Sequence, residues 1–129
     1  MKTSRNPESI AAPVGRYVHQ IEIEKPTKLL FIAGQVWMRP DGSVPDDPIE
    51  QLAVALENVL RNVEAAGMDT SDLMKITTYV VAGTELDPAR RRSEMERLLG
   101  EHVPTSTLVF VAALASPPYK VEIDGWAAR

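Results

Sequence analysis

The segment from Asp47 to Gly67 constrains the fold of this 129-residue chain more than any other. Asp47 is a favourable helix N-cap, Pro48 suits the first helical position, and Glu50 follows three residues after the cap. Gly67 is typical of the position just beyond a helix end. The pattern predicts one long helix that buries an apolar stripe against another element. The stripe recurs at steps of three and four residues and comprises Ile49, Leu52, Ala53, Leu56, Val59, Leu60 and Val63.

The segments on either side of this helix have the character of β-strands. Residues 17–24 alternate in the two-residue period of a strand, and residues 73–81 are rich in β-branched side chains. Residues 29–36 are apolar almost throughout, which predicts a central strand covered on both faces. Two further strands are expected within residues 104–114 and 120–126, separated by a loop that contains Pro117 and Pro118.

A second helix is expected from Asp87-Pro88 to about Leu99, just before Gly100. The order of elements predicts an α+β fold in which two helices pack on one face of a mixed β-sheet, as a single domain over residues 1–129. The other sheet face would then need a cover. We place the apolar row of Leu108, Phe110 and Ala112 on that face and expect it to meet another copy of the chain.

Composition excludes several classes of partner and chemistry. The formal net charge of -4 offers no basic field for nucleic acid, and no apolar run reaches the roughly 20 residues of a membrane span. The first residues do not resemble a secretory leader, so a cytoplasmic location is expected. The chain has no cysteine, and its two histidines, His19 and His102, are isolated in sequence. We therefore expect no metal site and no organic cofactor.

Three stretches carry a resemblance to a known family: Val14-Gly15-Arg16-Tyr17, residues 29–35, and Pro104 to Leu114 followed by residues 120–126. Their order resembles the RidA/YjgF family of small enamine/imine deaminases over nearly the whole chain. The resemblance implies a chorismate mutase-like fold and a homotrimer whose sheets face a central axis. It also implies ligand clefts between subunits that take a small-molecule substrate or metabolite.

Glu122 corresponds to the family glutamate that handles the attacking water. On a strand, its side chain points to the face opposite Val121 and Ile123, together with Lys120 and Asp124. In a cleft between subunits the carboxylate would orient or deprotonate water. The alternative is a solvated strand face whose charges pair only weakly.

Other site residues follow from the resemblance, and two of them depart from its pattern. Tyr17 matches a tyrosine at the cleft mouth, and Thr107 and Leu108 would supply main-chain groups beside the cleft. In the Ser-Gly-Gln pattern, Ala33 replaces the serine and Gly34 is kept. The departures suggest a less anionic, more apolar ligand.

The larger departure is at Ser106. Family members with deaminase activity carry an arginine there, in a Pro-x-Arg-Ser pattern, and that arginine binds the substrate carboxylate through two parallel hydrogen bonds. A serine hydroxyl is short and neutral. We hypothesise that Arg92, or Arg91, reaches the cleft from the second helix and replaces the missing guanidinium. The alternative is a solvated basic turn paired with nearby glutamates.

Three functions remain open from the sequence. One is hydrolytic deamination of a reactive enamine or imine with altered substrate preference, because Ser106 replaces the family arginine. Another is a non-catalytic trimer that binds a metabolite or regulates a partner. A different reaction on an unstable pathway intermediate lies between the two.

Overall fold

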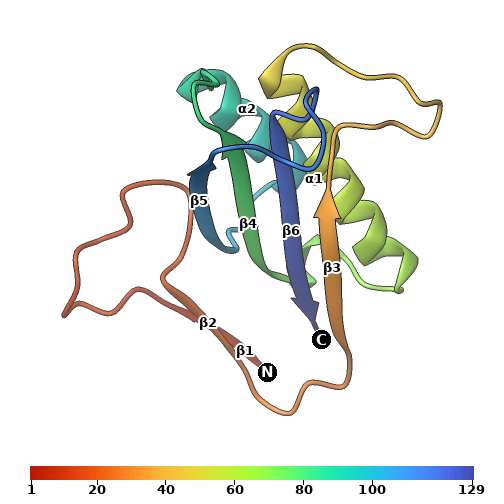
Figure 1. Ribbon diagram of the computed structural model, residues 1–129. Coiled ribbons are helices and arrows are strands. Elements are labelled where there is room, and N and C mark those ends of the chain that lie inside the picture. Colours follow the sequence, from red (N-terminus) through yellow and green to blue (C-terminus); the bar gives the residue numbers. More distant parts are fainter.

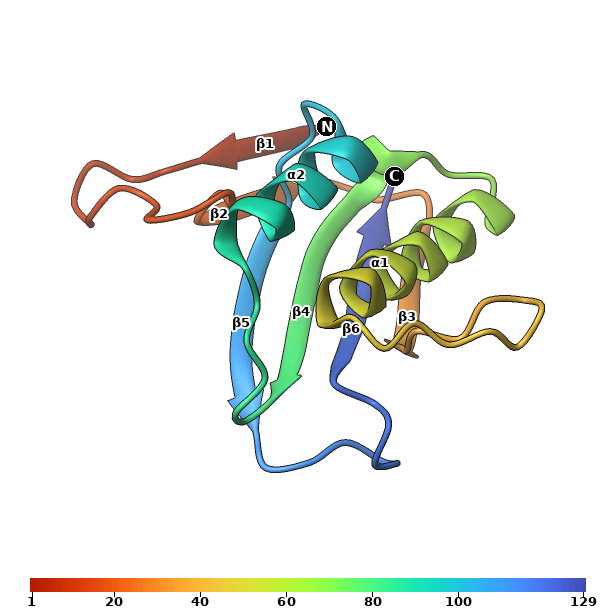
Figure 2. The ribbon, with the colours of Figure 1, turned by 90° about the horizontal axis from the view of Figure 1, so that it is seen from above.

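A computed structural model describes all residues from 1 to 129. Four strands form the main sheet in the order β3 (Leu29–Gln35), β6 (Val121–Ala128), β4 (Leu73–Val81) and β5 (Thr105–Val111), with β4 and β5 parallel and the other neighbours antiparallel. Both helices lie on one face of this sheet (Figures 1 and 2). The prediction of a mixed sheet with two helices on one face is thus confirmed. The remaining elements are β1 (Lys2–Arg5), β2 (Gln20–Ile23), α1 (Pro48–Ala65), a 3-10 turn (Thr70–Asp72) and α2 (Pro88–Leu99).

Both helices begin at the aspartates that the sequence indicates. The Asp47 carboxylate accepts a hydrogen bond from the Ile49 N–H at 2.9 Å, and the Asp87 carboxylate accepts one from the Ala89 N–H at 2.9 Å. Each cap satisfies a backbone donor that the helix itself leaves free. Neither helix has the length and apolar character needed to cross a membrane.

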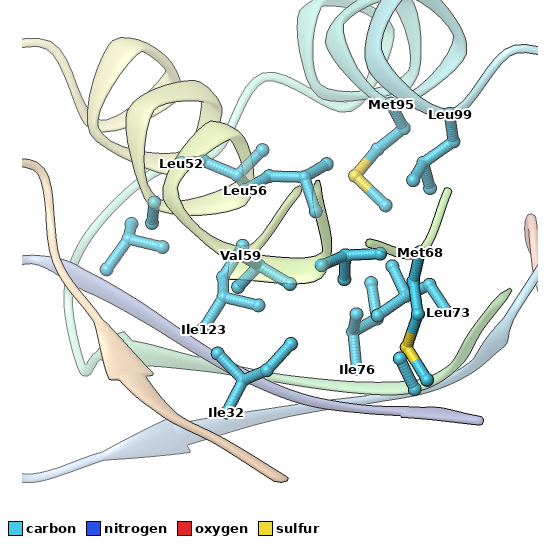
Figure 3. Packing of buried hydrophobic residues seen from close by; sticks show 14 residues of the cluster. Ile32, Leu52, Leu56, Val59, Met68, Leu73, Ile76, Met95, Leu99 and Ile123 are labelled. Atoms are coloured by element: carbon cyan, nitrogen blue, oxygen red, sulfur yellow. The ribbon is translucent and has the colours of Figure 1, made fainter. Parts of the chain in front are cut away.

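The hydrophobic core lies between α1 and the sheet, with α2 closing one side (Figure 3). Its members include Leu52, Leu56 and Val59 from α1, and Ile76 and Ile123 from the strands. The predicted apolar stripe is therefore the buried face of α1. This packing fixes which side of β6 faces the core and which side stays open.

Gln51 is a buried polar residue whose amide is fully used. Its Nε2 donates to the carbonyls of Pro45 and Pro118 at 3.1 and 3.2 Å, and its Oε1 accepts from the Lys120 N–H at 2.9 Å. Because Lys120 directly precedes β6, this side chain positions the start of the strand that carries Glu122.

The N-terminal segment differs from the expectation of a strand over residues 17–24. The strand β2 begins only at Gln20, and it pairs with β1, which the sequence analysis missed. These two strands form a separate ribbon outside the main sheet (Figure 1). A short polar strand such as β1 lacks the apolar alternation that marks a buried strand.

The strand β3 is apolar but is not central, so this prediction was wrong. It lies at one edge of the sheet, where Leu29 and Phe31 are 52% and 63% exposed. Apolar side chains on both faces indicate that burying both faces of the strand is favourable. They do not indicate whether both faces are buried by the same chain or one of them by another chain.

The placement of Leu108 and Phe110 on the uncovered face was also wrong. Their register partners in β4 are Thr78 and Val80, which face the helices, so Leu108 and Phe110 lie on the helix side. Ala112 lies just beyond the end of β5. The two-residue period groups side chains by face, but the pairing with β4 decides which face each group takes.

The uncovered face is nevertheless apolar near β3. Phe31 and Trp126 are register partners there, and their rings meet edge to face with centroids 4.8 Å apart. Trp126 is 52% exposed, and Val109 on β5 is partly exposed on the same face. We call this side, which carries the side chains of Phe31, Trp126, Val109 and Glu122, the open face.

Candidate functional site

A groove of about 670 Å³ lies between the N-terminal loop, α2 and the outer edge of β5. Eleven residues line it and none of them is acidic. They include Tyr17 from the loop, Arg91 and Arg92 from α2, and Ser106 and Leu108 from β5. The groove therefore brings together five of the residues that the sequence analysis associated with ligand binding.

The loop that forms one wall is tied to the rest of the molecule. The Val18 N–H donates to the Pro104 carbonyl at 3.4 Å, which joins the loop to the start of β5. Within the loop, the Val14 N–H donates to the Tyr17 hydroxyl at 3.4 Å. The Tyr17 ring also meets the His19 ring edge to face. These contacts hold Tyr17 half-buried at the groove.

The three arginines of the groove differ in their partners. Arg92 is exposed, and its Nε lies 2.9 Å from Glu96 Oε1, one turn further along α2. Arg91 is half-buried and pairs with no carboxylate of the chain. Arg16 was not singled out from the sequence. Its Nη2 donates to the Gly100 carbonyl, whereas its Nη1 is buried and has no hydrogen-bond partner.

Glu122 lies on the open face, where it is the register partner of Tyr79. Its carboxylate occupies the space beside Gly34: a Cβ at Gly34 would lie 1.8 Å from Glu122 Oε1 and 2.7 Å from Cδ. Glycine at this position is thus what lets the carboxylate lie against β3. Ala33, next to Gly34, is exposed, and its carbonyl accepts a hydrogen bond from Gln35 Nε2 at 2.9 Å.

Polar side chains surround Glu122 on the open face. The Tyr79 hydroxyl donates to Asp124 Oδ2 at 2.9 Å, and this hydrogen bond raises the pKa of Tyr79. Lys75 donates to the Thr107 hydroxyl, and burial lowers the pKa of its ammonium group. Thr107 therefore uses its side chain on the open face and does not line the groove.

One chain does not bring Glu122 and Ser106 together. Ser106 is the register partner of Ile76, a core residue, so it lies on the helix side of the sheet. Glu122 lies on the opposite side. Each face of the protein thus carries a different part of the expected site: Tyr17, Arg91, Arg92, Ser106 and Leu108 in the groove, and Ala33, Gly34, Thr107 and Glu122 away from it.

The tryptophans and histidines do not contribute to the groove. Trp37 is 4% exposed and packs against Tyr119, and Trp126 lies on the open face. The ring nitrogens of His19 and His102 lie 2.8 and 2.6 Å from the backbone carbonyls of Ala11 and Leu73. No group of three or more His, Asp or Glu side chains is arranged to hold a metal ion.

Comparison with known proteins identifies a family and several relatives to which the chain is similar. A family model described as endoribonuclease L-PSP matches residues 8–129. The protein TdcF of Escherichia coli strain K12 is 31% identical over all of this chain and 95% of its own length. The 2-iminobutanoate/2-iminopropanoate deaminase of the same organism is 31% identical over 95% of this chain and 94% of its own.

Solved structures extend the likeness to the fold. A Rid family protein from Yersinia pestis, YyfB, matches with a TM-score of 0.82 and 26% identity, covering 99% of this chain and 98% of its own. Escherichia coli TdcF with bound serine matches with a TM-score of 0.69 and 32% identity, over 98% of this chain and 95% of its own. The class is that of small α+β proteins in which two helices cover one face of a mixed sheet. Within that class, the chain belongs to the RidA/YjgF family.

Sequence reasoning missed Arg16 as a member of the groove. The signal was present, because Arg16 stands beside Tyr17 in a Gly-containing segment that the resemblance already included. What the sequence does not reveal is that this segment folds back onto the end of α2, where Arg16 binds the Gly100 carbonyl.

Proposed function

We propose that the protein hydrolyses the C=N bond of a small, reactive enamine or imine in a site shared by two copies of the chain. The observation that carries this proposal is the division of the site. The groove with Ser106 and the carboxylate of Glu122 lie on opposite sides of one sheet, so each is incomplete alone. A neighbouring copy that presents its Glu122 to the groove would complete the constellation. The relative named 2-iminobutanoate/2-iminopropanoate deaminase supports the reaction class.

The open face supports self-association. Phe31 and Trp126 form an exposed aromatic pair next to Leu29, which is also half exposed. Burying such apolar surface against another copy gains about 25 cal/mol for each Å² removed from water. We propose a homotrimer, as the family resemblance implies, in which the groove of one copy lies beside Glu122 of the next.

In this site Glu122 acts as the general base. In the iminium form, which is protonated at nitrogen, the water oxygen forms a bond to the imine carbon while the C=N π electron pair moves to nitrogen and Glu122 accepts a proton from the water. Glu122 then returns this proton to the nitrogen of the resulting carbinolamine. The C–N bond breaks and ammonia leaves, while the hydroxyl group gives its proton back to Glu122 and the carbon keeps the oxygen as a carbonyl. An enamine must first take up a proton at carbon to become the imine. A positioned base of this kind contributes roughly a factor of 10² to 10⁴ in rate.

We further propose that the substrate preference differs from that of relatives carrying the arginine. Ser106 cannot form the two-pronged bond of a guanidinium, so carboxylate recognition must use other groups or be weaker.

The expectations of no nucleic-acid or membrane partner, no metal or cofactor, and a cytoplasmic location remain predictions. Endoribonuclease L-PSP is the description of the family model, and we do not propose ribonuclease activity for this chain from it.

The test is hydrolysis of 2-iminopropanoate generated in situ, with Asp124→Asn as the matched control for Glu122→Gln. Both replacements remove one carboxylate from the same face of β6. Loss of activity with Glu122→Gln but not with Asp124→Asn would support the role of Glu122. Activity gained only with Ser106→Arg would show that water handling is intact and that carboxylate recognition limits the wild type.

A second candidate function is ligand binding without catalysis. The TdcF structure contains bound serine, which supports a small-molecule site in a relative. Wild-type protein and the Ser106→Arg variant that are both inactive on 2-iminopropanoate, yet bind small metabolites, would favour this function over deamination.

A further inference from the structure

We propose that Arg16, together with Arg91, binds the carboxylate group of the ligand in the groove and so takes the place of the arginine that the chain lacks at Ser106. This inference rests on the proposed function and narrows its substrate class to small organic carboxylates. It assigns the anion-binding role to the N-terminal loop and the first turn of α2 rather than to β5.

Arg16 is the residue of the groove with a buried hydrogen-bond donor that lacks an acceptor. One terminal nitrogen donates to the Gly100 carbonyl, which anchors the side chain at the end of α2. The other terminal nitrogen, Nη1, is buried without any hydrogen-bond partner. A buried cationic donor without an acceptor is costly, because it has lost water and gained nothing in return. Since Arg16 lines the groove, an anion bound there is the acceptor that the chain itself does not supply.

The charge around the groove points in the same direction. None of the lining residues is acidic, and Arg92 is already paired with Glu96. Arg91 remains half-buried without a carboxylate partner. Two guanidinium groups in one groove therefore lack counter-charges, and a planar guanidinium matches a carboxylate through parallel hydrogen bonds.

Ser106 supplies the space and one more donor. Its neighbours use their hydroxyls, since Thr105 donates to the Met74 carbonyl at 2.8 Å and Thr107 accepts from Lys75. The Ser106 hydroxyl has no partner within the chain and lies in the groove. A short side chain there leaves room for a ligand carboxylate to reach the opposite wall, where Arg16 and Arg91 lie.

The remaining lining favours an organic carboxylate over inorganic phosphate. Pro13, Val14, Met95 and Leu108 surround the cationic groups with apolar surface. A small carboxylate with an alkyl or carbonyl body can place its charge at the arginines and its body against these residues. Phosphate has no apolar part, so the same surface would leave several of its oxygens without partners.

The test is equilibrium binding to the intact protein, measured by calorimetry with pyruvate, its neutral analogue pyruvamide, and inorganic phosphate. The proteins are wild type, Arg16→Gln, Arg91→Gln, and the control Arg90→Gln. Arg90 lies on the same helix but pairs with Asp47 and does not line the groove. We expect pyruvate to bind at least about tenfold more tightly than pyruvamide, and Arg16→Gln or Arg91→Gln to remove most of that preference.

Arg16→Lys guards against misfolding of Arg16→Gln, because it keeps the charge but not the planar pair of donors. A folded Arg16→Lys protein with weakened pyruvate binding would support the inference. Pyruvate affinity that is unchanged in the Arg16 and Arg91 variants would overturn it, as would phosphate or pyruvamide binding as tightly as pyruvate. Binding of pyruvate through Arg16 without any imine hydrolysis would uphold this inference while refuting the proposed function.

Discussion

The contact between Gly34 and Glu122 makes a specific prediction for Gly34→Ala. The added Cβ would lie 1.8 Å from Glu122 Oε1 and 2.7 Å from Cδ, far inside van der Waals contact. The obstacle is the end of a flexible side chain, so the carboxylate will swing aside rather than force β3 away from β6. Holding a side chain off its preferred rotamer costs about 0.5–1.5 kcal/mol.

The stability change should be small because a second effect opposes this cost. Gly34 does not adopt a positive φ, so alanine fits its backbone and reduces the entropy of the unfolded chain by about 0.4–1 kcal/mol. The two contributions nearly cancel, and we expect the free energy of unfolding to change by less than about 1 kcal/mol. Activity should nevertheless fall by roughly 10² to 10⁴, because Glu122, the proposed general base, would have left its position.

The assay pairs urea unfolding with the rate of imine hydrolysis, for Gly34→Ala, Glu122→Ala and the double variant. In the Glu122→Ala background the obstacle is gone, so Gly34→Ala should no longer cost stability or further activity. Activity within about threefold of wild type in folded Gly34→Ala would refute the reasoning, since the position of the Glu122 carboxylate would then not matter.

Three further changes test the fold and the assembly. Asp72→Asn should destabilise the protein by about 2 kcal/mol, because the buried Asp72 carboxylate accepts hydrogen bonds from Lys2 and Arg129. Burial acts to raise the pKa of Asp72, but these hydrogen bonds hold it below its ordinary value of 3.8. The stabilisation that Asp72 contributes is therefore complete above about pH 3.8 and is lost as the pH falls below that value. Denaturant unfolding across pH should show the wild type and Asp72→Asn converging in acid. Gln51→Leu should cost about 2–3 kcal/mol in urea unfolding, since it leaves the Lys120 N–H and two carbonyls without partners, and an unchanged midpoint would argue against the clamp at the start of β6. Phe31→Glu should dissociate the proposed trimer in sedimentation with little loss of secondary structure because Phe31 is 63% exposed in one chain, and an unchanged mass would exclude the open face as the interface.

Local signals explain why the helices were predictable from the sequence. The caps at Asp47 and Asp87, the prolines after them and the three-to-four spacing of apolar residues all act within a few residues of one another. The strand β6 was equally clear, since the alternation of Val121, Glu122 and Ile123 is the alternation of buried and open sides in the sheet.

The errors concern pairing over long distances. Leu108 and Phe110 share a side because of strand alternation, but that side is set by parallel pairing with β4, about 30 residues earlier. The strand β3 was predicted to be central because both of its faces are apolar. A single sequence does not tell whether the second cover comes from the same chain or from another copy.

The candidate site shows the same limit. Ser106 and Glu122 were selected as residue types with a role, but their placement on opposite sides of the sheet follows from the register of two different strand pairs. Arg16 was missed because its importance depends on the loop meeting Gly100 at the end of α2. A contact between residues so far apart in the sequence, such as that between Arg16 and Gly100, cannot be inferred from the local pattern around either residue.

The central claim is that two copies of the chain complete one site, and a mixing experiment tests it most directly. Glu122→Gln removes the base and leaves the groove intact, whereas Ser106→Trp fills the groove and leaves Glu122 intact. Each variant alone should be inactive. After subunit exchange at equal amounts, roughly a quarter of the interfaces would combine an intact groove with an intact Glu122, and activity should recover to about that fraction of wild type. Mixtures of the two variants that remain inactive after exchange, verified by mass spectrometry of the assemblies, would contradict a site shared between copies.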